Sequence, residues 1–264
     1  MQSVQLQRKL VQHLQEIGLK LSKPQLTNLA LWCQGLATSP DCHLTNVALG
    51  LPIPGQRVNL VQRLRRFLDH EPPSWSNGYG HLVQHLLANW HGCEVALVMD
   101  RTDLGQRWSI LTLGVAYRKR LLPMTWRILP FGGTGEEVQK RLLNQVAPLL
   151  PTSRIHFYGD CEFRAVGLQG YCRSQNWHWH LGVKSDTHVE LADGTCHQLR
   201  SLPLVKGERK YWQALYLTQQ QRFGPVNLVG DWSPNQDHPR FWATDLPADP
   251  HAWRRGRKRF WIEP

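Results

Sequence analysis

Two aspartates stand where they could do chemistry, because each ends a run of mostly apolar residues. Asp100 ends the segment CEVALVMD, and Asp160 ends RIHFYGD. A short apolar run of this kind is typical of a strand buried on both faces. A carboxylate at its end costs free energy unless something compensates the charge. One such aspartate seen alone is more often a turn or capping residue. Two such aspartates, on the first and last strands of a predicted strand–strand–strand–helix–strand segment, indicate a shared site.

Metal-dependent phosphoryl transfer is a reaction that needs converging carboxylates. Mg²⁺ prefers oxygen ligands and keeps some waters and substrate phosphate in its shell. Two such ions about 3.5–4 Å apart can activate the attacking oxygen and stabilise the leaving one. A third acid is expected on a late helix that packs against the sheet. Glu263, at the end of RKRFWIE, is the candidate, and a solvated helix carboxylate is the alternative for it.

The segments around these acids predict a mixed α/β unit over residues 91–264. The predicted strands are CEVALVMD, WSILTLGVAYR, LLPMTWRILP, RIHFYGD, WHWHLGVK and RFWATDLP. Apolar periodicity predicts helices in EEVQKRLLNQVAPLL and FRAVGLQGYCRSQ, before and after RIHFYGD. Short alternating pieces between Gly, Asp and Pro turns predict a β-rich insertion at about 185–238. Asp249 and Pro250 are suited to begin a last, basic helix.

Residues 1–90 predict a separate helical unit. Apolar residues recur at helical spacing up to Leu21 and again after Ser22, a candidate helix cap. A short helix from about Thr45, a Gly/Pro turn and the basic segment RVNLVQRLRRFLDH have the outline of a helix-turn-helix. Its exposed cations would be those of a DNA-binding face: Arg63, Arg65 and Arg66. The basic face of an ordinary helical bundle is an equal alternative. Residues 74–78 (SWSNG) suggest a linker before another helix at about 81–90.

The charge balance points to a polyanionic partner. Lys and Arg number 31 against 20 Asp and Glu, which gives a net charge of +11. Nucleic acid is the simplest partner for such an excess, and a basic protein without one is the alternative. No apolar run approaches the roughly 20 residues that span a membrane. The N-terminus also lacks the order of a signal peptide, so a cytoplasmic, nucleoid-associated protein is expected.

Other side chains with reactive chemistry carry weaker signals. The spacings of the six cysteines match neither a zinc site nor a disulfide framework, so reduced thiols are expected. His178 and His180 alternate along a predicted strand without a third ligand at a suitable spacing. The segment FGGTGEE lacks the lysine and the spacing of a phosphate-binding loop. These features are therefore interpreted as structural.

Four blocks, VMDRTDL, YGDCEF, RFWATDLP and RKRFWIE, resemble the signature blocks of DDE transposases of the insertion-sequence-four family. The segments LALWCQGL, LTNVALGLP and RVNLVQRLRRFL are similar to the DNA-binding region of that group, so the resemblance covers nearly the whole chain. It implies an RNase H-like catalytic domain, which is a mixed sheet flanked by helices. It also implies a β-rich insertion between the second and third acids and an N-terminal DNA-binding domain.

The resemblance implies a DNA transposase, an endonuclease and polynucleotidyl transferase that cuts and joins DNA at the ends of an insertion sequence. Asp100, Asp160 and Glu263 match the catalytic, metal-binding acids, with Mg²⁺ as the cofactor and Mn²⁺ as a substitute. Arg259 matches an arginine that holds the DNA backbone, and two further cations, Arg257 and Lys258, lie beside it. The implied partners are double-stranded DNA (terminal inverted repeats and target) and a second copy of the chain in a homodimer on paired ends.

Two tryptophans of the insertion, Trp212 and Trp232, are candidates for stacking on a flipped base. Burial in the core is the commoner role for either of them.

Two departures from the family pattern bear on activity. Gly256 occupies the position of the family's tyrosine, and the chain stops at Pro264, before the position of the family's lysine. The chain is therefore expected to be truncated just after its third acid. The main alternative is a catalytically inactive remnant that only binds DNA or inhibits the full-length transposase. The nucleotide sequence past the stop codon distinguishes these two. A DNA-binding regulator built on the N-terminal helices alone is the third alternative.

Overall fold

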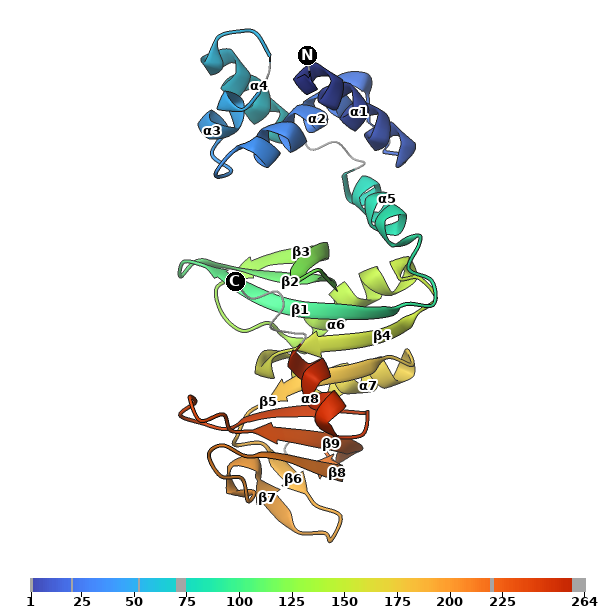
Figure 1. Ribbon diagram of the computed structural model, residues 1–264, viewed down its shortest axis with the longest axis vertical. Coiled ribbons are helices and arrows are strands. Elements are labelled where there is room, and N and C mark those ends of the chain that lie inside the picture. Colours follow the sequence, from blue (N-terminus) through green and yellow to red (C-terminus); the bar gives the residue numbers. More distant parts are fainter. Residues whose placement is uncertain (1, 20, 52, 70–74, 219–220, 258–264) are drawn as a thin grey trace. The chain divides into compact units, whose positions relative to one another are not determined.

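The computed structural model describes residues 2–19, 21–51, 53–69, 75–218 and 221–257. The chain divides into two compact units, 1–88 and 89–264, and the division falls next to the boundary expected at residue 90. The first unit is helical, and the second is a mixed α/β unit built on one sheet (Figure 1). None of the described helices is long and apolar enough to cross a membrane.

The helical unit contains five described helices, and the second begins at a capping residue and a first turn that suit a helix. Its helices are α1 (Gln2–Glu16), α2 (Lys23–Thr38), α3 (Leu44–Leu49), α4 (Arg57–Asp69) and α5 (Trp75–Leu87). Ser22 is the N-cap of α2, and its backbone N–H donates to the Gln25 side chain at 2.9 Å. Pro24 lies in the first turn, where its missing N–H costs nothing. These features agree with the cap predicted from the sequence.

The start of α5 corrects the expected linker at SWSNG, because the helix already includes residues 75–78. Gly78 in this stretch lowers helix propensity by roughly 1 kcal/mol relative to Ala. The apolar positions Tyr79, Val83 and Leu87 recur every four residues, and Val83 and Leu87 are buried. This apolar stripe outweighs the low helix propensity of the stretch that was predicted as a linker.

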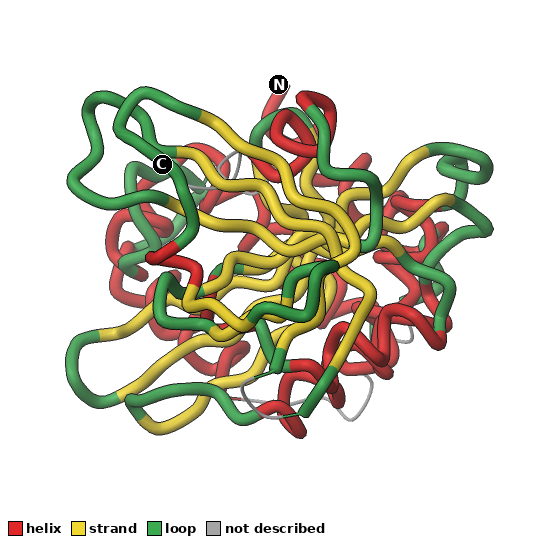
Figure 2. The backbone as a smooth tube through the Cα atoms, turned by 90° about the horizontal axis from the view of Figure 1, so that it is seen from below, coloured by secondary structure: helices red, strands yellow, loops and turns green. Residues whose placement is uncertain are grey.

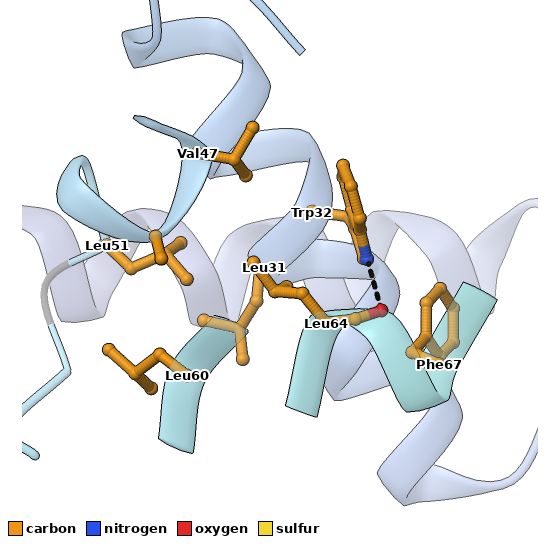
Figure 3. Close-up of a cluster of buried hydrophobic side chains, with 8 residues drawn as sticks. Leu31, Trp32, Val47, Leu51, Leu60, Leu64 and Phe67 are labelled. Carbon is orange, nitrogen blue, oxygen red and sulfur yellow. Dashed lines mark hydrogen bonds between the residues drawn. The ribbon is translucent and has the colours of Figure 1, made fainter. Parts of the chain in front are cut away.

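The core of the helical unit is formed by α2, α3 and α4 (Figure 3). Leu31 of α2 and Leu64 of α4 are almost completely buried, and the Trp32 indole N–H donates to the Leu64 carbonyl at 3.4 Å. Gly35 allows α3 to approach α2, since a Cβ there would lie 2.6 Å from Val47 Cγ1. The apolar face of α4 is therefore used for packing, and its polar face is left exposed.

In the described part of the second unit, ten strands form one mixed sheet in the order β3-β2-β1-β4-β5-β10-β9-β8-β6-β7. The first five strands are β1 (Glu94–Leu104), β2 (Trp108–Tyr117), β3 (Arg120–Pro130), β4 (Arg154–Gly159) and β5 (His178–Val183). The other five are β6 (His188–Glu190), β7 (Cys196–Gln198), β8 (Arg209–Leu217), β9 (Phe223–Asp231) and β10 (Arg240–Thr244). The strands turn progressively along the sheet (Figure 2), as expected for L-residues.

Five strands form the part of the sheet that carries the acids. Strand β1 pairs antiparallel with β2, and β2 pairs antiparallel with β3. Strands β4 and β5 are parallel to β1, and each is reached through a helix: α6 (Glu136–Val146) precedes β4, and α7 (Val166–Ser174) precedes β5. Parallel pairs require such crossovers. The predicted order of strands and helices in residues 93–184 is present in the structure.

The two faces of the sheet are covered by different helices. Figure 1 shows α6 and α7 behind the sheet and α8 (Pro250–Gly256) in front of it. On the α6–α7 face, alternate residues of the central strands are fully buried, which makes this face the main core. They are Val95, Leu97, Met99, Phe157, Trp179 and Leu181. The acids belong to the other face, because side chains alternate along a strand.

The predicted β-rich insertion corresponds to β6–β9, which lie between β5 and β10 in the chain. These strands do not form a separate layer, because β9 pairs with β10 and β8 with β9, so they extend the same sheet. Strand β9 (FGPVNLVGD) was not predicted as a strand, since Gly224 and Pro225 at its start suggest a turn. All six cysteines are free thiols, as expected.

Candidate active site

Asp100 and Asp160 occupy equivalent positions on neighbouring parallel strands. In the β1–β4 ladder Val98 pairs with Tyr158, and each acid lies two residues further along its segment. They therefore share one face of the sheet, at strands about 4.7–4.9 Å apart. Both side chains are half-buried. The two predicted acids thus lie side by side, on strands separated by about sixty residues of sequence.

The sequence prediction was wrong about where the first strand ends. Strand β1 continues past Asp100 to Leu104, and Asp100 pairs with Thr112 of β2. The acid therefore lies where β1 loses its parallel neighbour β4 and keeps its antiparallel neighbour β2. Pairing with β2 fixes the backbone of Asp100.

Asp160 is held by the turn that follows β4. It is the N-cap of the short 3₁₀ helix η2 (Cys161–Phe163), and its Oδ1 accepts the backbone N–H of Glu162 at 2.7 Å. Strand β5 approaches this turn closely at Gly182, where a Cβ would lie 2.9 Å from the Cys161 nitrogen and 3.1 Å from the Asp160 carbonyl carbon. Only a residue without a Cβ fits at this position without moving the Asp160 backbone.

Three residues that sequence reasoning did not single out, Arg101, Thr134 and Glu162, contact one another next to the segments that carry the acids. Arg101 Nε lies 3.2 Å from Glu162 Oε2, and the Arg101 guanidinium also donates to the Gly132 carbonyl. Glu162 Oε1 accepts the backbone N–H and the hydroxyl of Thr134 at 2.8 and 2.7 Å. Their signal was present in the sequence, because Arg101 and Glu162 lie inside the blocks VMDRTDL and YGDCEF. Thr134 lies in the glycine-containing loop FGGTGEE, and its contacts with Glu162 are consistent with a structural role for that loop.

Helix α8 packs on the face of the sheet that carries the acids. Its Ala252 joins a buried cluster with Val229 and Trp242, and Trp242 pairs with Gly182 of β5. Asp249 caps the helix by accepting the Ala252 N–H at 2.6 Å, as the sequence predicted. The expected third acid Glu263, and the DNA-contacting candidates Arg259 and Lys258, lie outside the described residues.

An aromatic and basic pocket of about 440 Å³ adjoins α8. Trp232, Trp242 and Trp253 line it, and the Arg209 and Arg257 guanidinium groups lie 3.5 and 4.9 Å from the centre of the Trp253 ring. Of the two stacking candidates, Trp232 therefore lines a cavity. Trp212 does not line this pocket and instead packs over Gly230, where a Cβ would lie 2.8 Å from its ring.

Histidines fill the sheet face next to the acids. His156 and His180 are almost completely buried, and their rings share a hydrogen bond of 3.1 Å. Tyr158 stacks on His180 at 4.8 Å, and burial raises the pKa of its hydroxyl far above the ordinary value. His178 instead pairs with Asp245 at 2.7 Å. These contacts agree with the structural interpretation of the strand histidines.

In the helical unit, the structure separates the three arginines predicted to bind DNA. All three are exposed. Arg63 and Arg66 line a polar groove of about 550 Å³ between α2 and α4, together with Asn28 and Asn59. Arg63 Nε donates to Asn28 Oδ1 at 2.8 Å, which orients its guanidinium. Arg65 does not line the groove.

Among the described residues, no group of three or more His, Cys, Asp and Glu side chains is arranged to hold a metal ion. Of the three acids expected from the sequence, Asp100 and Asp160 are among the described residues and Glu263 is not. No model of a known protein family matches the chain, and no curated protein matches it.

Proposed function

We propose that this chain is a DDE-type transposase of the insertion-sequence-four family, which cuts DNA and transfers strands at the ends of an insertion sequence. The observation that carries the proposal is the register of Asp100 and Asp160, which brings two carboxylates to the same face of adjacent parallel strands. Carboxylate oxygens are the ligands that Mg²⁺ and Mn²⁺ favour. The donor set therefore suits a divalent cation shared by the two acids.

The topology supports an RNase H-like catalytic domain. The strand order β3-β2-β1-β4-β5, with β2 antiparallel to the three parallel strands β1, β4 and β5, accords with that fold. The insertion β6–β9 falls after the second acid and before α8, where the family has its β-rich insertion. Because one fold can host many different activities, the proposed function rests on the two acids and not on the topology alone.

The length of the chain after α8 supports Glu263 as the third ligand. Gly256 lies over the Trp242 ring, and Trp242 is two strands from the position of Asp160, which corresponds to about 10 Å. Glu263 is the seventh residue after Gly256, and the chain spans these seven steps. They cover about 10 Å as a helix and about 23 Å when extended. The length of chain is therefore compatible with Glu263 as a third ligand of the same cation.

In this proposal the chain positions the reacting groups. Asp100 and Asp160 hold Mg²⁺, which when bound supplies Lewis-acid activation of the attacking water or 3′-hydroxyl and stabilises the leaving oxygen. The η2 N–H orients Asp160 by donating to Oδ1. The arginines at the end of α8 contribute positive charge that DNA phosphates favour on the same face of the sheet.

Two further surfaces fit DNA. The groove lined by Asn28, Asn59, Arg63 and Arg66 combines positive charge with amide groups that can hydrogen-bond to base edges. The pocket beside α8 offers Trp232 as a stacking surface next to cationic groups, which suits an unstacked nucleotide. We therefore propose the groove as the DNA-binding face of the helical unit and Trp232 as the stacking residue.

The test is nicking of a supercoiled plasmid that carries the ends of the element encoding the chain, with Mg²⁺ or Mn²⁺. We expect metal-dependent nicking that Asp100→Ala and Asp160→Ala abolish, while a plasmid without these ends is cut less. Nicking that survives either substitution contradicts the site. DNA binding without nicking, in a protein that still binds Mn²⁺ through these acids, would favour the inactive remnant.

A further inference from the structure

Two residues next to the acids connect the chain segments that carry them. Arg101 follows Asp100, and Glu162 comes two residues after Asp160. The 3.2 Å ion pair between them lies beyond Val98 and Tyr158, which pair between β1 and β4. The ion pair therefore links β1 to the turn that follows β4, at the level where the acids lie.

This ion pair is partly shielded from water and is fixed at both ends. The Arg101 and Glu162 side chains are 24% and 20% exposed, so solvent screens their attraction less than that of a surface pair. Glu162 also accepts two hydrogen bonds from Thr134, and the buried Gln139 side chain donates to the Thr134 carbonyl and hydroxyl, both at 2.9 Å. The loop before α6 thus holds the carboxylate in one orientation.

The same contacts bear on the proposed metal ligands. The backbone N–H of Glu162 donates to Asp160 Oδ1, so anchoring the Glu162 side chain also fixes the group that orients the Asp160 carboxylate. Arg101 lies on the opposite face of β1 from Asp100, since side chains alternate along a strand. Both oxygens of Glu162 are engaged by Thr134 and Arg101, which favours a positioning role over that of a metal ligand.

We propose that Arg101 and Glu162 are positioning residues that hold Asp100 and Asp160 in register for a shared divalent cation. This inference rests on the proposed function, because it requires the two acids to bind metal. Groups that orient metal ligands without touching the metal typically change metal affinity or activity by 10–100-fold when they are replaced. An effect of that size is expected here.

The experiment measures the affinity of the full chain for Mn²⁺ from the resonance signal of the free ion, with urea unfolding in parallel. Glu162→Gln keeps an acceptor for Thr134 and removes the charge that faces Arg101, and Arg101→Met removes the cation. Both variants should weaken Mn²⁺ binding about 10–100-fold. Arg101→Lys, which keeps the charge, should restore part of the affinity.

A matched control lies near the other edge of the same sheet. Glu190 of β6 pairs with Arg222 through two hydrogen bonds of 2.9 and 3.0 Å, so Glu190→Gln breaks a comparable Arg–Glu pair away from the acids. It should leave Mn²⁺ affinity unchanged. A loss in the control equal to that in Glu162→Gln would show a general effect of weakened folding and would overturn the positioning role.

The remaining outcomes separate this inference from the proposed function. Wild-type affinity for Mn²⁺ in Glu162→Gln and Arg101→Met, together with loss in Asp100→Asn, overturns the positioning role alone. Loss in Glu162→Gln with unchanged affinity in Arg101→Met also overturns it, because Glu162 would then act as a ligand. Both proposals are overturned if the wild-type chain does not bind Mn²⁺, or if Asp100→Asn and Asp160→Asn leave its Mn²⁺ affinity unchanged.

Discussion

The helical unit and the sheet unit position their candidate functional groups in different ways. In the helical unit, one helix carries both kinds of residue: Leu60 and Leu64 of α4 face the core, while Arg63 and Arg66 of the same helix line the groove that it shares with α2. In the sheet unit, no single element makes the site, because Asp100 and Asp160 meet only through the pairing of β1 with β4. The arginines of the first unit are therefore placed by the exposed side of one helix, whereas the acids of the second unit are placed by the pairing of two strands.

The largest expected effect concerns packing in the helical unit alone. Leu64 is 2% exposed in the core of α2, α3 and α4, so Leu64→Ala should lower the free energy of unfolding by about 2–5 kcal/mol. Urea unfolding of the full chain measures this change, and Mn²⁺ binding by the sheet unit should not change. Leu68→Ala, at a position on the same helix that is 55% exposed, is the control and should change stability by less than about 0.5 kcal/mol. Loss of Mn²⁺ binding in Leu64→Ala would show that the two units are coupled.

Coupling of packing and function in the sheet unit is tested at Gly182. A Cβ there would press on the backbone of Asp160 and Cys161, so Gly182→Ala should shift the acid and reduce nicking by about 100-fold, as small misplacements of reacting groups do. Gly170→Ala in α7 is the matched control, because a Cβ at Gly170 meets no atom within 4 Å. Equal nicking by the two variants would contradict the role given to the close approach of β5.

These two units also differ in how much could be predicted from sequence. The helices, the strands of residues 93–184 and the capping residues Ser22 and Asp249 follow from local periodicity and turn chemistry. The register of Asp100 with Asp160 depends on pairing between distant segments, which periodicity cannot specify. The ion pair between Arg101 and Glu162 depends on the same pairing. Both residues lie in the blocks VMDRTDL and YGDCEF, but their contact could not be predicted from the sequence.

The smallest expected effect is a difference in DNA affinity between two arginine variants of α4. Arg66 lines the groove between α2 and α4, so Arg66→Ala should weaken DNA binding and reduce the slope of log affinity against log salt concentration by about 1. Arg65→Ala removes the same charge from an exposed position that does not line the groove, and its effect should be smaller. Fluorescence anisotropy with labelled duplex DNA across a salt series measures both slopes. A larger loss in Arg65→Ala would assign DNA binding to a different face of α4.

The most direct test of the proposed active site is the binding of Mn²⁺ to the purified chain and to its single acid variants. Asp100→Asn and Asp160→Asn preserve the size of the side chain and remove its charge, so each should reduce Mn²⁺ affinity at least tenfold, while Asp186→Asn, at an exposed acid, should not. Loss in both active-site variants, with folding intact by urea unfolding, is the predicted result. Mn²⁺ binding that is unchanged in either Asp100→Asn or Asp160→Asn would contradict a metal site shared by these two strands.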